Sequence, residues 1–182
     1  MTKIKSIQTI NQINVFPNMP VTAVDFLDRL TGKAIVLDSD SKIALVGSSL
    51  NNIYTLPGGG IDQGETIEEG IIREITEEIG CNAKIDYVLG IIDDYRNRDK
   101  THCINHCAVA KVVGQKGIAK LTEEEKKNGL HVKWVILEEA LDILNKEKMS
   151  VLRGEINFYN TAFNIIRDDI FLVEFSKMNS KN

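Results

Sequence analysis

Three glutamates in one short segment, Glu74, Glu77 and Glu78, have a spacing that suits metal-assisted chemistry. Apolar residues at 67, 71, 72, 75 and 79 follow one helical face and predict a helix over 66–79, which Gly80 ends. At about 100° per residue, the three carboxylates share a sector beside this apolar stripe. Their mutual repulsion calls for a cation, and Mg²⁺ commonly bridges such carboxylates to phosphate oxygens. The segment therefore predicts a magnesium-phosphate site.

A turn of sequence Pro57-Gly58-Gly59-Gly60 precedes this helix. Alone, a glutamate-rich helix face is usually solvated and a run of glycines is usually a turn, so neither feature decides the function. Together they fit one eight-position pattern, whose chance match is on the order of one in 10⁹ per starting point at ordinary residue frequencies. The eight positions are Gly59, Glu65, Arg73, Glu74, Ile75, Glu77, Glu78 and Gly80.

This pattern is the Nudix box, and the chain resembles the Nudix hydrolase family. The box covers residues 59–81 and departs from the family at Cys81, where an aliphatic residue is usual and a cysteine acts as a small hydrophobe. Outside the box the order of elements is similar, with a strand hairpin before it, and a strand over 131–135 and a short acidic helix after it. The resemblance implies an α/β/α sandwich around a mixed β-sheet.

The resemblance also implies roles for residues in the box. Glu77 and Glu78 are expected to bind Mg²⁺ directly, with Mn²⁺ as a substitute, and the Gly58 carbonyl oxygen is expected as a third ligand. Glu74 is expected to be a further ligand, or the general base that accepts a proton from the attacking water. Arg73 is expected to orient the loop and the catalytic glutamate. The positions with a structural role are Gly59, Glu65, Arg73 and Gly80.

Many members of the family supply another carboxylate from the loop before the late tryptophan strand. Here Asn128 stands six residues before Trp134, so the candidates shift to Glu123, Glu124 and Glu125. We select Glu125 as the catalytic candidate because it is nearest in the chain. A solvated charge run is the equal alternative.

An aromatic and basic cluster follows a predicted strand at Tyr95, Arg96, Arg98 and Lys100. Tyr95 can stack on a base, and Arg96 and Arg98 can neutralise substrate phosphates, so we predict that these three bind substrate. The alternative is a solvated loop.

The resemblance implies hydrolysis of a phosphoanhydride bond in a nucleoside diphosphate linked to another moiety. Nucleoside triphosphates, nucleotide sugars and dinucleoside polyphosphates stay open as substrates. A catalytically silent domain that only binds a nucleotide is the second hypothesis, and the three intact box glutamates argue against it.

The composition, with 43% hydrophobic and 26% charged residues in 182, is that of an ordinary globular chain, so one domain over 1–182 is expected. A net charge of −4 disfavours binding to nucleic acid. No apolar run approaches the roughly 20 residues of a membrane span and residues 1–14 lack a signal-peptide pattern, so a cytoplasmic protein without membrane contact is expected. Three cysteines predict reduced thiols. Dimers are common in the family, which makes a homodimer a further expectation.

The remaining patterning predicts an α/β chain with a mixed sheet. Strands are expected over 33–38 and 42–47 as a hairpin, and then over 51–56, 83–92, 102–113 and 131–136. The segment 114–129 is expected to be a loop with at most a helical turn. Helices are expected over 138–145 and about 155–169, with a frayed tail over 176–182.

Overall fold

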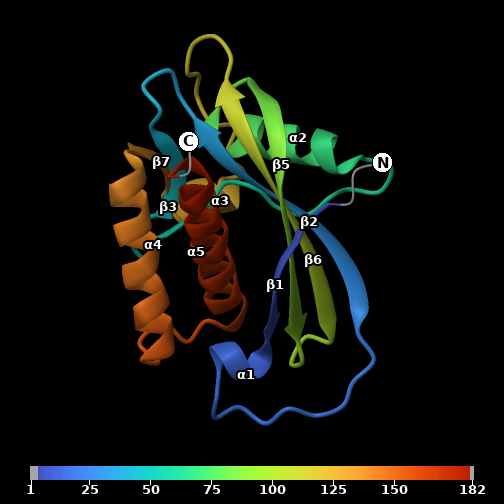
Figure 1. Ribbon diagram of the computed structural model, residues 1–182. Coiled ribbons are helices and arrows are strands. Elements are labelled where there is room, and N and C mark those ends of the chain that lie inside the picture. Colours follow the sequence, from blue (N-terminus) through green and yellow to red (C-terminus); the bar gives the residue numbers. More distant parts are fainter. Residues whose placement is uncertain (1–3, 181–182) are drawn as a thin grey trace.

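The computed structural model describes residues 4–180 (Figure 1). Its strands form one mixed sheet in the order β1-β5-β6-β2-β3-β4, with β7 also paired to β3. The pairs β1–β5 and β2–β6 are parallel, and the other pairs are antiparallel. The strands are β1 (Ser6–Asn11), β2 (Leu27–Leu37), β3 (Ile43–Ser48), β4 (Ile53–Thr55), β5 (Ala83–Arg96), β6 (Thr101–Val112) and β7 (Leu130–Val135).

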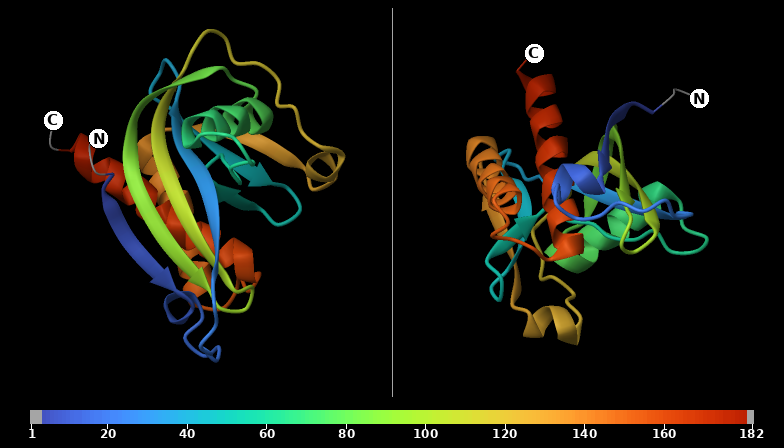
Figure 2. Two further views of the ribbon diagram at one scale, coloured as in Figure 1. Left: turned by 90° about the vertical axis from the view of Figure 1, so that its right-hand side faces the viewer. Right: turned by 90° about the horizontal axis from the view of Figure 1, so that it is seen from below.

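Helices cover both faces of this sheet. One face carries α2, and the other carries α4 and α5, as the views in Figures 1 and 2 show. The predicted α/β/α sandwich is therefore confirmed. The helices are α1 (Gln12–Val15), α2 (Ile67–Ile79), α3 (Glu123–Lys127), α4 (Leu137–Leu152) and α5 (Tyr159–Asn179).

The central strands alternate side-chain size between the two faces. On β2, Ala34 and Val36 pack with α2, whereas Ile35 packs with the residues of α4 and α5. On β6, Ala108 and Ala110 face α2, and Val109 faces the other way. A strand buried on both faces must be apolar throughout, and the small residues on one face leave room for α2 to lie close to the sheet.

The predicted hairpin over 33–38 and 42–47 forms, but its two strands pair antiparallel only beside the turn. Its turn forms, since the Asp38 carboxylate accepts hydrogen bonds from the backbone N–H groups of Asp40 and Lys42. However, β2 and β3 pair only at Leu37 and Ile43. Instead, all of β2 pairs in parallel with β6. Alternation reveals a strand but not its partner, because the partner is fixed by the tertiary fold.

Several element boundaries also differ from the predicted ones. Strand β5 ends at Arg96 rather than at residue 92, and strand β6 begins at Thr101 rather than at residue 102. The helix α4 runs to Leu152 rather than 145, and α5 begins at Tyr159 and continues to Asn179. The prediction of a frayed tail over 176–182 is thus wrong for residues 176–179, which belong to α5. Residues 181–182 lie outside the described part of the chain. The elements β1 and α1 were not predicted.

Two features bear on the expected setting of the protein. Within residues 4–180, no helix combines the length and apolarity that a membrane crossing requires. All three cysteines are buried and unpaired: Cys81, Cys103 and Cys107.

Candidate active site

Both ends of α2 are fixed by local chemistry, which sets the direction in which its glutamates point. At the start, the Thr66 hydroxyl accepts from the Glu69 N–H, and the Glu69 carboxylate accepts from the Thr66 N–H. This reciprocal capping box satisfies two backbone donors that the helix leaves free. At the end, Gly80 has a φ of 67°, a left-handed conformation that suits glycine. The prediction of this helix is confirmed.

Arg73 ties the box together through its guanidinium group. Its Nε and Nη2 donate to the two carboxylate oxygens of Glu65 at 2.8 and 3.1 Å, and Nη2 also donates to the Gly60 carbonyl at 2.9 Å. Its Nη1 donates to Glu74 at 2.8 Å and to Glu77 at 3.2 Å. The hydrogen bonds that Arg73 donates to Glu65 and Glu74 raise the pKa of Arg73, so it stays charged. One cation thus holds the preceding loop against the helix face.

Glu78 lies deeper in the fold than the other two glutamates of the site. Its Oε2 accepts from the Gly58 N–H at 2.7 Å. Burial raises the pKa of Glu78 to about 7, although the nearby Lys33 ammonium and the hydrogen bond from Gly58 oppose that rise. A carboxylate in this state gains from a divalent cation beside it, because a cation restores the charged form.

Lys33 and the glycines close the loop over the box. The Lys33 ammonium donates to the carbonyl oxygens of Leu56 at 2.8 Å and Gly58 at 2.5 Å. Gly58 has a φ of 129°, and a Cβ there would lie 2.1 Å from the Gly32 carbonyl oxygen. A Cβ at Gly59 would lie 2.5 Å from a Glu74 carboxylate oxygen. Glycine is therefore required at Gly58, where the obstacle is backbone, whereas a side chain at Gly59 would displace the Glu74 carboxylate.

The donor set fits a hard divalent cation, which prefers carboxylate and carbonyl oxygens. Among residues 4–180, however, no three acidic, histidine or cysteine side chains converge as a ready metal site. The reason lies in Arg73, which holds the carboxylates of Glu74 and Glu77 in hydrogen bonds while Glu78 turns to the Gly58 amide. The metal-ligand roles of Gly58, Glu74, Glu77 and Glu78 stay predictions.

The loop before α3 is anchored to the end of α2. The Gly117 N–H donates to the Gly80 carbonyl at 3.0 Å, and the Lys120 N–H donates to the Glu77 carbonyl at 2.7 Å. These hydrogen bonds place α3 near the box, and the charge of Glu125 on this helix contributes to the raised pKa of Glu78. The Glu125 carboxylate itself accepts from Thr122 in a capping box. Its catalytic role stays a prediction.

The three predicted substrate-binding residues are dispersed. Tyr95 stacks on the His102 ring at 4.3 Å between centroids and lines a cavity of about 550 Å³ together with residues 21–24 and Phe26. Arg98 pairs with Asp99, and its guanidinium lies 4.0 Å from the centre of the Tyr159 ring. Neither residue lines the polar cavity that reaches Gly58 and Gly59. Tyr95 points to the opposite face of β5 from Arg96, because alternate residues of a strand do so, and Arg98 lies beyond the end of β5. Their substrate role stays a prediction.

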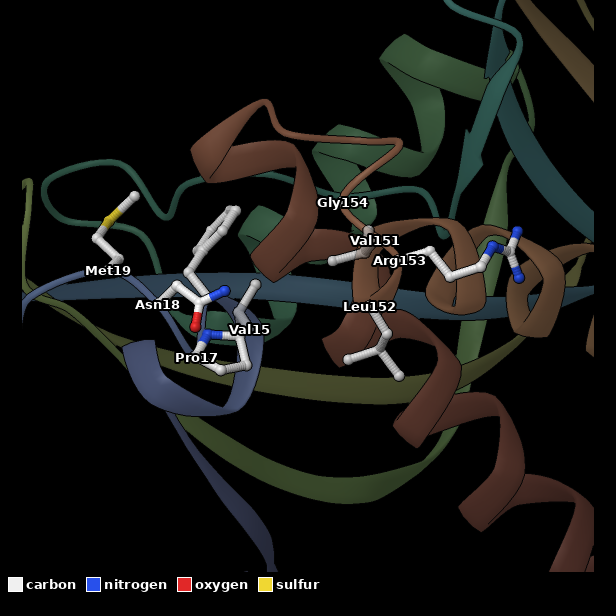
Figure 3. Close-up of a pocket in the computed structure, with 9 residues that line it drawn as sticks. Val15, Pro17, Asn18, Met19, Val151, Leu152, Arg153 and Gly154 are labelled. Carbon is white, nitrogen blue, oxygen red and sulfur yellow. The ribbon is translucent and has the colours of Figure 1, made fainter.

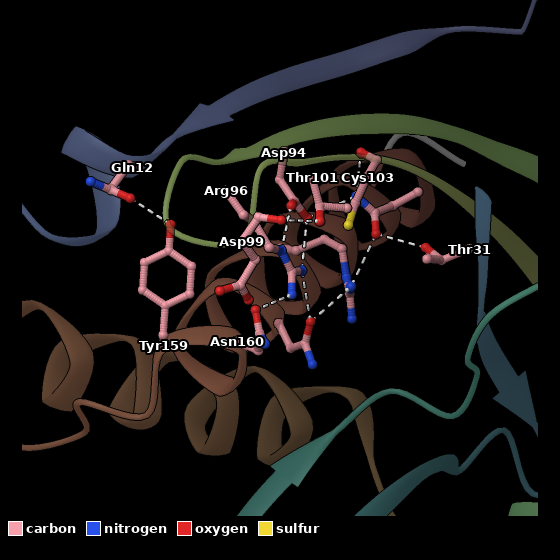
Figure 4. A network of polar contacts seen from close by, with 12 residues as sticks. Gln12, Thr31, Asp94, Arg96, Asp99, Thr101, Cys103, Tyr159 and Asn160 are labelled. Atoms are coloured by element: carbon pink, nitrogen blue, oxygen red, sulfur yellow. Dashed lines mark hydrogen bonds and ion pairs between the residues drawn. The ribbon is translucent and has the colours of Figure 1, made fainter. Parts of the chain in front are cut away.

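Arg96 lies in a different environment, a buried polar network that Figure 4 shows. Its guanidinium donates to both carboxylate oxygens of Asp94, at 2.7 and 3.1 Å, and to the side-chain oxygens of Asn160 and Asn164. This network borders a polar cavity of about 170 Å³ that reaches Gly58 and Gly59. Its lining residues are Arg29, Thr31, Lys33, Gly58, Gly59, Arg96, Cys103, Asn160, Asn164 and Arg167.

Most of this lining was missed from the sequence. Only Gly58, Gly59 and Arg96 had been singled out. The available signals were the lysine that begins an apolar strand, Lys33, and the run Arg167-Asp168-Asp169 inside an apolar helix pattern. Such charges are expected inside a fold only when they are paired or used.

A separate cavity of about 400 Å³ lies between the segment after α1 and the end of α4 (Figure 3). Its lining is mostly apolar, including Val15, Met19 and Val151. Its one charged side chain, Arg153, pairs with Glu155. Its lining includes no carboxylate, histidine or cysteine side chain that could bind a metal ion or transfer a proton.

Comparison with known proteins decides the family. A sequence model of the NUDIX domain matches residues 29–154, more than half of the chain. The chain belongs to this family. The match covers the box, and it confirms the resemblance drawn from residues 59–81.

Curated NUDIX relatives match over part of their length. The chain is 33% identical over 82 residues to the ADP-ribose pyrophosphatase of Methanocaldococcus jannaschii, covering 43% of this chain and 48% of that protein. It is 38% identical over 68 residues to a putative 8-oxo-dGTP diphosphatase of Bacillus subtilis, covering 37% and 46%. The chain thus spans about half the length of the curated relatives it matches.

Solved NUDIX structures share the fold. A MutT protein from Methanosarcina mazei Go1 superposes with a TM-score of 0.56 at 18% identity, covering 86% of this chain and 99% of that one. A NUDIX hydrolase from Nitrosomonas europaea gives a TM-score of 0.55 at 19% identity, covering 78% and 88%. At such identities the likeness concerns the fold alone.

Proposed function

We propose that this NUDIX protein hydrolyses a phosphoanhydride bond in a nucleoside diphosphate linked to another moiety, using Mg²⁺ or Mn²⁺. The observation that carries the proposal is the box geometry, in which one guanidinium positions Glu74 and Glu77 beside the partly buried Glu78. The relatives support hydrolysis of a phosphoanhydride bond. Their names include an ADP-ribose pyrophosphatase and an RNA pyrophosphohydrolase, which differ in the nucleotide but share a pyrophosphate-cleaving activity.

The residues of the box would divide the work between binding and proton transfer. Glu77, Glu78 and the Gly58 carbonyl would hold the cation, which when bound makes water more acidic and offsets phosphate charge. Glu74 would accept the proton of the attacking water. Arg73 would keep Glu74 in place, because its Nη1 binds one carboxylate oxygen at 2.8 Å and leaves the other available. Glu125 would add negative charge at the edge of the site.

Hydrolysis of a panel of nucleotides in Mg²⁺ tests this proposal. The panel includes ADP-ribose, nucleoside triphosphates, nucleotide sugars, dinucleoside polyphosphates and a 5′-triphosphorylated oligonucleotide. Glu77→Gln and Glu74→Gln are expected to lose about 10²–10⁴-fold in kcat with the fold intact. Glu68→Gln is the matched control, since Glu68 is exposed on the first turn of the same helix, and it is expected to keep full activity.

Two results would contradict the proposal. If Glu77→Gln and Glu68→Gln hydrolyse equally well, the box is not the reacting site. If no substrate is cleaved but a nucleotide still raises the melting temperature, the protein is a binding module. A cytoplasmic location and a homodimer stay predictions, which fractionation and light scattering check.

A further inference from the structure

The 170 Å³ cavity lies directly beside the box, on the other side of the Gly58–Gly59 loop. Lys33 lines it and connects the two, since its ammonium binds the Gly58 carbonyl oxygen while its charge acts on Glu78 and Glu74. The Gly58 backbone thus contacts both the cavity wall and the glutamates, since its carbonyl accepts from Lys33 and its N–H donates to Glu78.

The cavity lining carries an excess of positive charge. Four cationic side chains border it, from Arg29, Lys33, Arg96 and Arg167, and no carboxylate lines it. Two carboxylates lie behind this lining: Asp94 pairs with Arg96, and Asp168 pairs with Arg167. Arg29 therefore remains without a carboxylate partner in the wall. Burial lowers the pKa of Lys33, and the carboxylates of Asp168, Glu78 and Glu74 oppose that change.

Arg167 has a donor that nothing satisfies. Its Nε binds Asp168, and its Nη1 binds the side-chain oxygens of Asn105 and Asn164 at 3.0 and 3.1 Å. Its Nη2 is buried without a hydrogen-bond partner, although the residue is only 3% exposed. A buried polar group left unpaired costs about 1–3 kcal/mol. Such a group is retained where a ligand supplies the missing acceptor.

Arg29 provides a second open donor group at the mouth of the cavity. It is exposed, and its side chain forms no hydrogen bond or ion pair among residues 4–180. The side-chain amides of Asn160 and Asn164 also line the cavity, and their oxygens already accept hydrogen bonds from Arg96. The open groups are thus donors, which favours an acceptor-rich anion.

The size of the cavity limits what it holds. At about 170 Å³ it is smaller than the roughly 300–1,000 Å³ typical of pockets for drug-sized ligands, so it takes a group rather than a whole nucleoside. Planar guanidinium forks match phosphate oxygens in geometry and charge. Phosphate meets both requirements.

We propose that this cavity binds a phosphate group of the substrate beyond the two that flank the cleaved bond. This proposal rests on the proposed function, and it selects a class of substrate among those that the proposed function allows. Nucleotides with three or more phosphates are the favoured class, and ADP-ribose and nucleotide sugars, which carry two, are disfavoured. Arg29 and Arg167 are the specificity-determining residues.

Binding of inorganic pyrophosphate to protein freed of metal on a chelating resin tests the site without any hydrolysis. Asn164→Asp is the sharpest variant, because aspartate can accept the same hydrogen bonds from Arg96 and Arg167 while adding a negative charge to the wall. Calorimetric titration is expected to show binding to the unaltered protein and at least a tenfold loss in Asn164→Asp. Asn145→Asp, an exposed change on α4, is the matched control and is expected to bind normally.

A second variant guards against a folding artefact. Arg29→Gln changes an exposed side chain, and it is expected to weaken pyrophosphate binding about tenfold. Arg153→Gln makes the same charge change far from the cavity and is expected to have no effect. Unchanged affinity in both Asn164→Asp and Arg29→Gln, or no binding by the unaltered protein, would overturn the proposal.

The active protein gives a separate readout. Arg29→Gln is expected to lower the preference for a nucleoside triphosphate over ADP-ribose, measured as the ratio of kcat/KM values, about tenfold through KM. A protein that binds pyrophosphate at this cavity but hydrolyses nothing would refute the proposed function and keep the phosphate site. If the protein is a hydrolase whose preference ratio does not change in Arg29→Gln, the proposed function stands and the phosphate site is refuted.

Discussion

The two sides of the Gly58–Gly60 loop are opposite in charge and in construction. On the α2 side, Glu65, Glu74 and Glu77 share one guanidinium, that of Arg73, and their side chains are 15–48% exposed. The carboxylate of Glu78 accepts from the Gly58 N–H instead. On the α5 side, Arg96 and Arg167 are buried, each with one aspartate. We call the α2 side of this loop the acidic side and the α5 side the basic side. The acidic side is thus short of cations, and the basic side is short of anions. A metal ion and a phosphate chain, bound together, would supply what each side lacks.

The difference in burial implies that the two sides respond differently to mutation. A partly exposed carboxylate is solvated by water when its partner is lost, whereas a buried charge that loses its partner has no substitute. We therefore expect changes on the acidic side to affect activity and changes on the basic side to affect stability. Three substitutions test this contrast, in addition to those proposed above.

Asp168→Asn is expected to have the largest effect, a loss of about 3–5 kcal/mol in the free energy of unfolding. Asp168 is fully buried, and it accepts from Arg167 Nε at 2.8 Å and from the Leu56 N–H at 3.0 Å. An amide keeps the contact to Leu56 but leaves the Arg167 charge unbalanced. Urea denaturation measures the loss. Glu77→Gln is the comparison on the acidic side, and equal destabilisation by both variants would contradict the contrast.

Arg73→Lys is expected to reduce kcat about 10²-fold, with little change in stability or KM. An ammonium cannot reproduce the planar fork that binds Glu65, Glu74 and the Gly60 carbonyl at the same time. The glutamates then lose their alignment but stay solvated. Steady-state kinetics with Arg153→Lys as control gives the answer. An effect on KM alone would mean that Arg73 binds substrate rather than positioning Glu74.

The acidic side was predictable from sequence because it is local. The glutamate positions follow from helical geometry, and Thr66 and Gly80 mark the ends of that helix in the sequence itself. Nothing beyond a segment of two dozen residues is needed to bring these carboxylates onto one face. Their roles as ligands or base still rest on the family resemblance.

The basic side was not predictable because tertiary pairing assembles it. The parallel register of β2 and β6 places Arg29 opposite Cys103 and Thr31 opposite Asn105, and no local pattern contains that register. On α5, the charges at 167–169 resemble a solvated helix end, so the predicted helix stopped at 169. In the fold they are buried and paired, and the helix continues past them.

A substitution of Glu147 is expected to have the smallest effect of the three. It tests directly whether this buried carboxyl group offsets the charge of the arginines on the basic side. It extends from α4 toward β4, where its Oε1 accepts from the Tyr54 N–H at 2.7 Å and its Oε2 is buried without a partner. Burial raises the pKa of Glu147 to about 8, with Asp168 contributing to the rise. At neutral pH this carboxyl group is therefore largely neutral and does not offset the arginines.

The raised pKa gives the pH dependence a definite sign. The unfolded chain releases the Glu147 proton near pH 4.5, whereas the folded protein holds it to about pH 8, so stability falls as pH rises between these values. Glu147→Gln keeps the acceptor for Tyr54 and removes this loss, but it buries an unpaired amide. We expect a net gain of about 1–2 kcal/mol at pH 8 and a small loss at pH 4.5. Denaturant titrations at both pH values measure it against Glu138→Gln, an exposed change on the same helix. A difference that does not vary with pH would mean that Glu147 is ionised in the fold, and that the basic side has a third balancing carboxylate.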